Sequence, residues 1–321
     1  VRDGVTSGSP WGRRAPGILA ILGTVACTVA CVGDGTPGLV PPRPAPAPVH
    51  DVAPWVSAQD GTMPLVLVAP HGGTLAPAEL PDRDCPACVT VNDANTRLLA
   101  LAIADAFQQR AGVRPFVVAN LLSRAKFDAN RDLAEATDAY APLTPLWNLF
   151  HTRIDSAKSR ATRVHPRALL VDLHGHAHAI QRLELGYRLT ANTLRLPDSL
   201  LAPMLVASSI ARLDAVAASG DAGVALLRGA RSLGTRFSAA GILAVPSATA
   251  PSPLLGEAYF DGGYNTDRHG SLGGVGAVDA VQLEAHYAGI RDTEAARAAF
   301  ADVFVTVLLQ YLADHYAWSP P

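Results

Sequence analysis

Two histidines stand just after apolar segments and directly before glycine, where buried strands can deliver metal ligands. His71 follows the apolar run 65–68, and His174 follows the run 169–173. The neighbouring glycines let backbone and ligand approach closely. Two imidazoles and one carboxylate leave the fourth position of a zinc ion open, as in catalytic zinc sites. The pair therefore predicts a catalytic Zn2+ site.

Two carboxylates are candidates for the third ligand. Asp93 lies at the expected start of a helix over 93–110, where its side chain can cap the helix or turn to a metal. Glu79 is nearer to His71 along the chain but lies in a proline-rich loop. We favour Asp93.

A further acidic residue, Glu284, lies inside the apolar segment 281–285. An ionised carboxylate is costly in such a strand unless it has a partner. Glu284 is therefore a candidate general base, which takes a proton from a metal-activated water and returns it to the leaving amine. The alternative is a glutamate at a sheet edge that faces solvent together with Gln282 and His286.

One loop carries two guanidinium groups and an amide. A guanidinium pairs with a carboxylate through two parallel hydrogen bonds, so Arg124, Asn130 and Arg131 are candidate contacts to a substrate carboxylate. The alternative is solvated charge, in which Asp128 and Asp132 neutralise the arginines.

A glycine-rich loop over 262–270 precedes Glu284 and could close over a substrate. Tyr264, Asn265 and His269 are its candidate substrate contacts. A plain surface loop is the alternative interpretation.

Short apolar runs alternate with amphipathic segments from about residue 55 onward. Strands are predicted at 65–68, 116–118, 169–173 and 281–285, and helices over 93–110, from Thr144 and from Thr293. This order is typical of an α/β protein whose parallel or mixed sheet is covered on both faces. Open sheets of this kind bind ligands beyond the carboxyl ends of their strands, so the candidate residues are expected to share one site.

The composition limits the classes of function. With 321 residues, 49% of them hydrophobic and 17% charged, the chain is typical of a globular protein. Its net charge of -2 and the lack of a basic cluster in the sequence argue against nucleic-acid binding.

The segment 1–31 resembles an export signal, because Arg13 and Arg14 precede an apolar run over 18–30 that is too short to span a bilayer. Small residues before Cys31 resemble a lipoprotein signal, and Cys27 is the rival attachment site. A simply cleaved signal or a buried N-terminal helix is the alternative. Membrane association is expected only through this lipid anchor, at the cell envelope or in the periplasm.

Residues 32–54 are rich in proline and glycine, which predicts an extended tether, and the catalytic domain is expected over 55–321. Export would permit a disulfide between Cys85 and Cys88. We favour such a local staple over a redox or zinc motif.

Taken in order, these segments resemble the N-formylglutamate amidohydrolases from about residue 64 to the C-terminus. The segments that carry the resemblance are 70–73, Asp93, Arg124 with 128–131, 172–175, 262–264 and 282–284. That family is similar to zinc carboxypeptidases and aspartoacylases, which implies a three-layer α/β/α sandwich with a mixed, mostly parallel sheet. The resemblance implies His71 and His174 as zinc ligands and Glu284 as the base. It also implies Asn130, Arg131 and Arg124 as contacts to the carboxylate and carbonyl groups of the substrate.

The chain departs from this pattern at one position. Zinc carboxypeptidases carry a ligand glutamate three residues after the first histidine, where this chain has Thr74, so the middle ligand stays open. The segment 175–178 also matches the terminal metal motif of metallophosphoesterases, but the sequence lacks the other motifs of that fold.

The expected activity is zinc-dependent hydrolysis of an amide bond in a small substrate that carries a carboxylate, such as an N-acyl amino acid. An envelope carboxypeptidase or a γ-glutamyl peptidase is the alternative among enzymes. The alternative from another class is a surface lipoprotein that binds a metal or a carboxylate without turnover.

Overall fold

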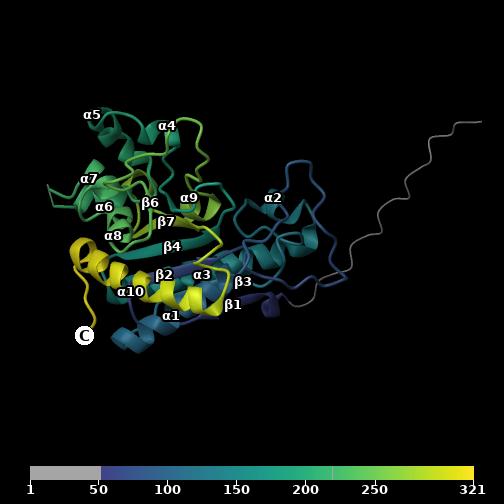
Figure 1. Ribbon diagram of the computed structural model, residues 1–321. Coiled ribbons are helices and arrows are strands. Elements are labelled where there is room, and N and C mark those ends of the chain that lie inside the picture. The colour runs from purple at the N-terminus through teal and green to yellow at the C-terminus, as the bar shows by residue number, and fades with distance from the viewer. Residues whose placement is uncertain (1–51, 219) are drawn as a thin grey trace, which may run out of the picture. The chain divides into compact units, whose positions relative to one another are not determined.

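The computed structural model describes residues 52–218 and 220–321 (Figure 1). The predicted export signal over 1–31 lies outside these residues, and so do the candidate lipidation sites Cys27 and Cys31. The predicted tether over 32–54 also lies outside them, except for its last three residues.

A seven-stranded mixed sheet forms the centre of the described domain, with the strand order β1-β3-β2-β4-β7-β5-β6. Neighbouring strands are parallel except for the antiparallel pairs β1–β3 and β5–β7. The strands are β1 (Val56–Gln59), β2 (Leu65–Ala69), β3 (Phe116–Asn120), β4 (Ala168–Gly175), β5 (Leu183–Gly186), β6 (Ala244–Val245) and β7 (Val278–Ala285). The central strands are buried at nearly every position because both faces of the sheet are covered.

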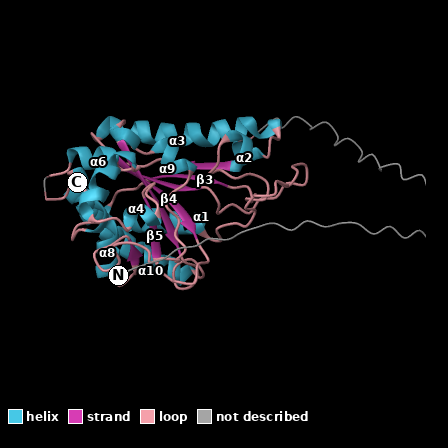
Figure 2. Cartoon of the chain, turned by 90° about the horizontal axis from the view of Figure 1, so that it is seen from above, coloured by secondary structure: helices cyan, strands magenta, loops and turns pink. Residues whose placement is uncertain are grey.

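Helices lie on both faces of this sheet, which confirms the predicted three-layer α/β/α architecture (Figure 2). The α-helices are α1 (Thr96–Ala111), α2 (Leu133–Thr137), α3 (Thr144–Val164), α4 (Ala191–Leu194), α5 (Asp198–Leu201), α6 (Ala211–Val216), α7 (Val224–Arg228), α8 (Leu233–Ala239), α9 (Tyr264–His269) and α10 (Glu294–Tyr316). Short 3-10 helices are η1 (Ala53–Trp55), η2 (Ala141–Leu143), η3 (Ala202–Ala207) and η4 (Leu272–Gly274).

Alternate positions along each strand belong to different cores. Leu65 and Leu67 pack into the core that contains α1 and α10, whereas Val66 and Val68 pack into the core that contains α3. This division follows from the two-residue period of a strand. Figure 2 shows α3 and α10 on opposite sides of the sheet.

Helix α10 is long and apolar enough to cross a membrane by length and composition alone. In the described domain it packs against α1 and α8, and Phe304, Leu308 and Leu312 are fully buried in the core. These buried side chains belong to the core between α10 and the sheet.

The predicted strands are confirmed as parts of β2, β3, β4 and β7, and the helices predicted from Thr144 and Thr293 are α3 and α10. Helix α1 begins at Thr96 rather than at Asp93, because Asn95 is its N-cap and has a left-handed conformation. The apolar pattern does not predict β1, β5 and β6, which are only two to four residues long and show no readable period.

The carboxyl ends of β2, β4 and β7 lie at one edge of the sheet because these strands are parallel. His174 on β4 is paired with Glu284 on β7, and Glu184 on β5 is paired with Glu284 from the other side. Side chains that are directly opposite across strands share one face of a sheet. The register therefore places His174, Glu284 and Glu184 next to one another on three adjacent strands.

Candidate active site

His71, Asp93 and His174 form a buried cluster whose candidate ligand atoms lie within 4.8 Å of one another. Asp93 Oδ2 lies 3.2 Å from Nδ1 of His71 and 3.0 Å from Nδ1 of His174. His71 follows β2, Asp93 precedes α1, and His174 lies in β4. Glu79, the alternative third ligand, is exposed and is not part of this group. The structure thus brings both predicted imidazoles and the favoured carboxylate together.

Each imidazole is held by another carboxylate through its second ring nitrogen. Nε2 of His71 lies 2.6 Å from Asp128 Oδ1, and Nε2 of His174 lies 3.0 Å from Asp172 Oδ2. If each Nε2–H donates to its carboxylate, each Nδ1 presents its lone pair to the space beside Asp93. Histidines that bind metals are oriented by outer carboxylates in this way.

Negative charge is concentrated in this buried cluster. Burial would raise the pKa of Asp93, but the electrostatic interaction with His71 and hydrogen bonds from both rings hold this pKa well below its usual range. Burial would lower the pKa of His174, but Asp172 and the bond to Asp93 raise it well above its usual range. A divalent cation beside both Nδ1 atoms would take the place of these protons, so the donor set fits zinc.

Glu284 lies next to His174 across the sheet. Its Oε1 accepts a hydrogen bond from Nε2 of Gln282 at 2.8 Å and lies 3.9 Å from Nδ1 of His174. Its Oε2 is buried and has no hydrogen-bond partner among the described residues. Burial raises the pKa of Glu284 to about 8, which suits a group that accepts and returns a proton near neutral pH. The alternative of a solvent-facing edge glutamate is wrong, because β7 is an interior strand and Glu284 is 3% exposed.

The two arginines of the predicted carboxylate-binding loop have different surroundings. Arg124 is buried, its Nε donates to Asp128 Oδ2 at 2.9 Å, and its Nη1 lies 3.6 Å from Asp93 Oδ1. Arg131 is partly exposed and pairs with Glu135 at 3.5 Å. Both arginines line the cavity over the cluster. Arg124 is thus largely neutralised by the protein, whereas Arg131 is available to a ligand.

Asn130 connects the start of helix α9 to His174. Its Oδ1 accepts a hydrogen bond from the backbone N–H of Asn265 at 2.7 Å, and its Nδ2 lies 3.2 Å from Nε2 of His174. Gly263 lies against this amide, and a Cβ built at position 263 would lie 2.3 Å from Nδ2 of Asn130. A side chain at position 263 would therefore displace the Asn130 amide from its place beside His174.

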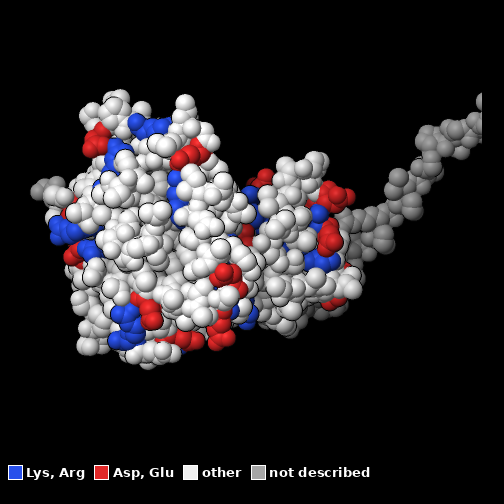
Figure 3. All heavy atoms as spheres, viewed as in Figure 1, with Lys and Arg blue, Asp and Glu red and all other residues white. Residues whose placement is uncertain are grey.

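A cavity of about 480 Å³ opens over the cluster and contains Glu284 in its lining. The exposed apolar residues Val89, Val91 and Phe260 also line it. Figure 3 shows the surface hollowed between the part of the domain that carries α2 and the part that carries α4. A cavity of this volume is suited to a small molecule.

The loop predicted to close over the substrate contains helix α9 and only partly lines the cavity. Tyr264 lines a smaller neighbouring hollow, of about 320 Å³, together with Arg131. Asn265 is fully buried, and its Nδ2 donates to Asp172 Oδ1 at 3.3 Å. Asn265 therefore positions other side chains of the site and does not face the cavity.

The structure does not bring His269 to the cavity, which corrects the sequence prediction for this residue. Helix α9 turns it toward α3 instead, because these residues form a helix and not an open loop. Nε2 of His269 lies 3.0 Å from Nδ1 of His151, and its Nδ1 lies 3.2 Å from Asp155. The two histidines and Asp155 form a separate polar cluster.

Burial lowers the pKa of His151 to about 3, whereas the unperturbed value is 6.5. Between these values the unfolded state binds a proton that the folded state does not, so the free energy of unfolding falls as the pH falls. We expect His151 to contribute a loss of about 2 kcal/mol between about pH 6.5 and about pH 4.5. Urea unfolding at both pH values should show a smaller loss for His151→Gln. An equal loss in the two proteins would contradict this assignment.

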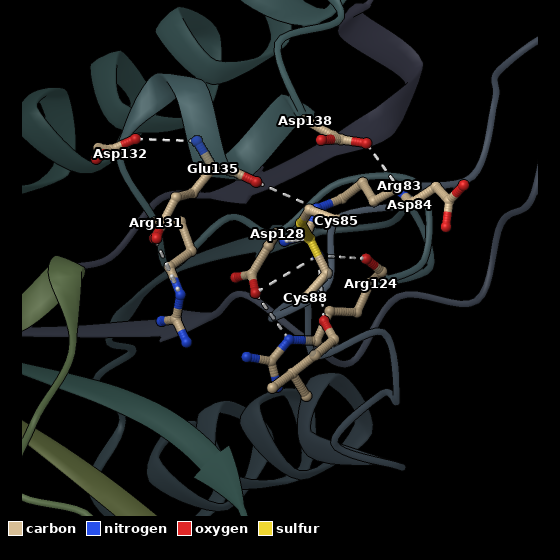
Figure 4. The surroundings of a disulfide bond; sticks show 11 residues. Arg83, Asp84, Cys85, Cys88, Arg124, Asp128, Arg131, Asp132, Glu135 and Asp138 are labelled. Carbon is tan, nitrogen blue, oxygen red and sulfur yellow. Dashed lines mark hydrogen bonds and ion pairs between the residues drawn. A yellow bond between two sulfur atoms is a disulfide. The ribbon is translucent and has the colours of Figure 1, made fainter. Parts of the chain in front are cut away.

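Cys85 and Cys88 form a disulfide in the loop before Asp93, the local staple that the sequence favours (Figure 4). Arg83 connects this disulfide to the site, since its Nη2 donates to Cys88 Sγ at 3.1 Å and its Nη1 lies 3.7 Å from Asp128 Oδ2. Backbone carbonyls accept further hydrogen bonds from this buried guanidinium. Arg83 thus ties the disulfide loop to the carboxylate that holds the first imidazole.

The sequence pattern assigns no role to Arg83, Asp172 or Arg291, all of which lie at or beside the cluster. Asp172 precedes His174 by two residues in one strand, so the strand period places both on one face, and this signal could have found it. Arg83 and Arg291 reach the site from loops that are distant in sequence. No motif or spacing in the sequence indicates that Arg83 and Arg291 belong to the site.

The geometry defines an α/β/α domain with a buried two-histidine, one-aspartate cluster and a neighbouring glutamate at the carboxyl edge of its sheet. The chain matches no protein-family model and no curated protein. Among solved structures it is similar to an N-formylglutamate amidohydrolase from Ralstonia eutropha, with 12% identity, a TM-score of 0.48, and coverage of 81% of this chain and 97% of that one. A gene product from Agrobacterium tumefaciens shows 14% identity and a TM-score of 0.49, with coverage of 81% of this chain and 95% of that one. The first of these structures bears the name of the family that the sequence motifs resemble.

Proposed function

We propose that this protein is a zinc-dependent amidohydrolase, related to the N-formylglutamate amidohydrolases, that cuts an amide bond in a small substrate carrying a carboxylate. The observation that carries the proposal is the convergence of Nδ1 of His71 and Nδ1 of His174 on one oxygen of Asp93, with Glu284 beside them. Three protein ligands and an adjacent proton-transfer group are the usual parts of a zinc hydrolase site.

Each residue of the site has a distinct proposed role. His71, Asp93 and His174 would hold the ion, which supplies a Lewis acid for the substrate carbonyl when bound. Glu284 accepts a proton from the attacking water at its unpaired Oε2 and passes it to the leaving amine. Gln282 orients this carboxyl group by donating to Oε1.

Arg131 is the proposed contact to the substrate carboxylate. It lines the cavity and is partly exposed, its Nη1 donates to the backbone carbonyl of Asn130 at 2.9 Å, and its Nε lies 3.5 Å from the surface residue Glu135. Arg124 also lines the cavity, but Asp128 uses its Nε, so we assign it mainly to positioning. Asn130 offers its amide beside His174. Because Val89, Val91 and Phe260 line the cavity, the substrate panel should include N-acyl amino acids with apolar acyl groups.

The test uses the full chain loaded with zinc and a panel of N-acyl amino acids and γ-glutamyl peptides. We expect amine release from members of the panel, loss of activity with a chelator, and recovery when Zn2+ is restored. Arg131→Met is expected to raise KM about 10- to 100-fold for substrates that carry a carboxylate, because a charge-assisted hydrogen bond is lost. Arg163→Met, an exposed change on α3, is the matched control and should leave KM unchanged.

Two outcomes would contradict this function. Turnover that persists after complete metal removal would exclude the zinc mechanism. Stoichiometric zinc binding without turnover of any member of the panel would favour the non-catalytic binding protein.

We also propose that the protein acts in the cell envelope. The signal-like segment 1–31 supports export, and the disulfide between Cys85 and Cys88 is of the kind that persists in oxidising compartments. Any membrane association would come from a lipid on Cys31 or Cys27.

A further inference from the structure

Arg291 lies in the loop between β7 and α10, and its guanidinium is buried beside the candidate zinc site. Arg291 is 3% exposed and lines the cavity. Its Nε donates to the backbone carbonyl of Ala285 at 3.0 Å, its Nη1 donates to that of Ala94, and its Nη2 donates to that of His176 at 3.4 Å. One planar group with a fixed fork of donors therefore contacts three separate segments of the chain.

The first of these segments carries the candidate ligand Asp93. Ala94, whose carbonyl accepts from Arg291, directly follows Asp93. Nδ2 of Asn95 in turn donates to the backbone carbonyl of Arg291 at 2.8 Å, so the two loops are joined by hydrogen bonds in both directions. The position of Asp93 is thus tied to the loop that follows β7.

The same guanidinium joins the ends of β4 and β7. Ala285 directly follows Glu284, and its carbonyl accepts both Nε of Arg291 and the backbone N–H of His176, the latter at 3.1 Å. His176 is two residues after His174. These contacts fix the end of the strand that carries the ligand relative to the strand that carries the base.

The guanidinium occupies space that Gly175 leaves free. A Cβ built at position 175 would lie 2.2 Å from Cζ of Arg291 and 2.6 Å from its Nε. A side chain there would displace the guanidinium, whose three nitrogen atoms already donate to backbone carbonyls. Gly175, at the end of β4, therefore permits the contact between this strand and Arg291.

We propose that Arg291 is a positioning residue, which sets the spacing between two of the proposed zinc ligands and the proposed base. Those three residues are Asp93, His174 and Glu284. This inference rests on the proposed function. Lysine is not equivalent here, because its ammonium group is a point charge and cannot span three carbonyls as the guanidinium fork does.

The test compares Arg291→Ala and Arg291→Lys with the unaltered full chain, by a zinc competition titration and by steady-state kinetics with the site saturated with Zn2+. We expect both variants to bind zinc about 10- to 100-fold more weakly. We expect kcat to fall by about 10- to 100-fold because the reacting groups are misplaced, and KM to change little because Arg131 remains. Lysine keeps the positive charge, so similar losses in the two variants would identify the geometry as the cause.

Arg228→Met is the matched control. Arg228 also donates to backbone carbonyls, those of Leu194 and Leu196, but it does not line the cavity. Its replacement should leave zinc affinity and kcat unchanged.

Rescue by free guanidinium ion is a readout that a purely structural role would not change. At a millimolar concentration, well below the denaturing range, the ion can enter the space left in Arg291→Ala and donate to the same carbonyls. We expect it to restore part of the zinc affinity and of kcat in that variant. It should restore neither in Asp128→Asn, which keeps Arg291.

Gly175→Ala tests the same contact without removing the arginine. It should displace the guanidinium and lower zinc affinity, and it should cause little further loss when combined with Arg291→Ala, because the space is then vacant. Circular dichroism verifies that each variant is folded. Where Arg291→Ala does not fold, Arg291→Lys and Gly175→Ala decide the question.

Several outcomes would overturn the role of Arg291. They are unchanged zinc affinity and kcat in a folded Arg291→Ala, full activity of Arg291→Lys, no rescue by guanidinium ion, or unchanged zinc affinity in Gly175→Ala. Zinc binding and turnover by the unaltered protein would leave the proposed function standing in each case. The absence of both in the unaltered protein would remove the proposed function and this inference with it.

Discussion

Glu284→Gln is expected to lower kcat by about 100- to 10,000-fold and to leave the zinc content unchanged. Glutamine has the size of glutamate and can still hydrogen-bond to Gln282, but its amide cannot accept a proton at neutral pH. Glu284 is not a member of the His71, Asp93 and His174 ligand group, so the metal should stay. The loss falls on kcat because the proton transfer takes place in the chemical step.

Steady-state kinetics on the best substrate of the panel, with metal analysis of the same samples, measures this effect. Glu79→Gln is the matched control, because Glu79 is exposed and lies outside the ligand group. It should leave both kcat and zinc content unchanged. Full activity of Glu284→Gln would rule Glu284 out as the base, and loss of zinc would make it a ligand instead.

His71→Ala is expected to abolish zinc binding at the candidate zinc site and hydrolysis with it, because one of three protein ligands is removed. Asp128→Asn should have a smaller effect, since the imidazole remains but loses the carboxylate that lies 2.6 Å from its Nε2. Loss of such an outer partner lowers metal affinity by about 10- to 100-fold. A competition titration with a coloured chelator at one pH measures the zinc affinity of each variant.

We expect zinc affinity to decrease in the order unaltered protein, Asp128→Asn, His71→Ala. Unaltered zinc affinity in His71→Ala would remove His71 from the ligand set, and the proposed mechanism would be lost with it. Equal affinity in Asp128→Asn and the unaltered protein would show that Asp128 does not support a metal ligand.

The predictable part of the fold is the set of strands that are buried on both faces. β2, β3, β4 and β7 carry continuous apolar runs because helices cover the sheet on both sides. β1, β5 and β6 are only two to four residues long, which is too short for a strand period to be recognised in the sequence. The small helices between residues 191 and 239 are four to seven residues long and carry no long amphipathic period.

Part of the candidate site follows from the same rule. His71 and His174 could be placed together because parallel strands end at one edge, and Glu284 joins them from a third parallel strand. His269 could not be placed, because its direction depends on how α9 packs against α3 and not on its distance from Glu284 along the chain.

By itself, the sequence determines which chemical groups stand at the ends of the buried strands, because strand burial and polar interruption are local properties of the chain. The tertiary structure alone decides which ring nitrogen of each histidine faces Asp93, that Arg124 is already engaged by Asp128, and that Glu184 meets His178. These relations depend on strand register and on contacts between distant loops. Such contacts are set by the packing of the whole domain, and no short segment contains both partners.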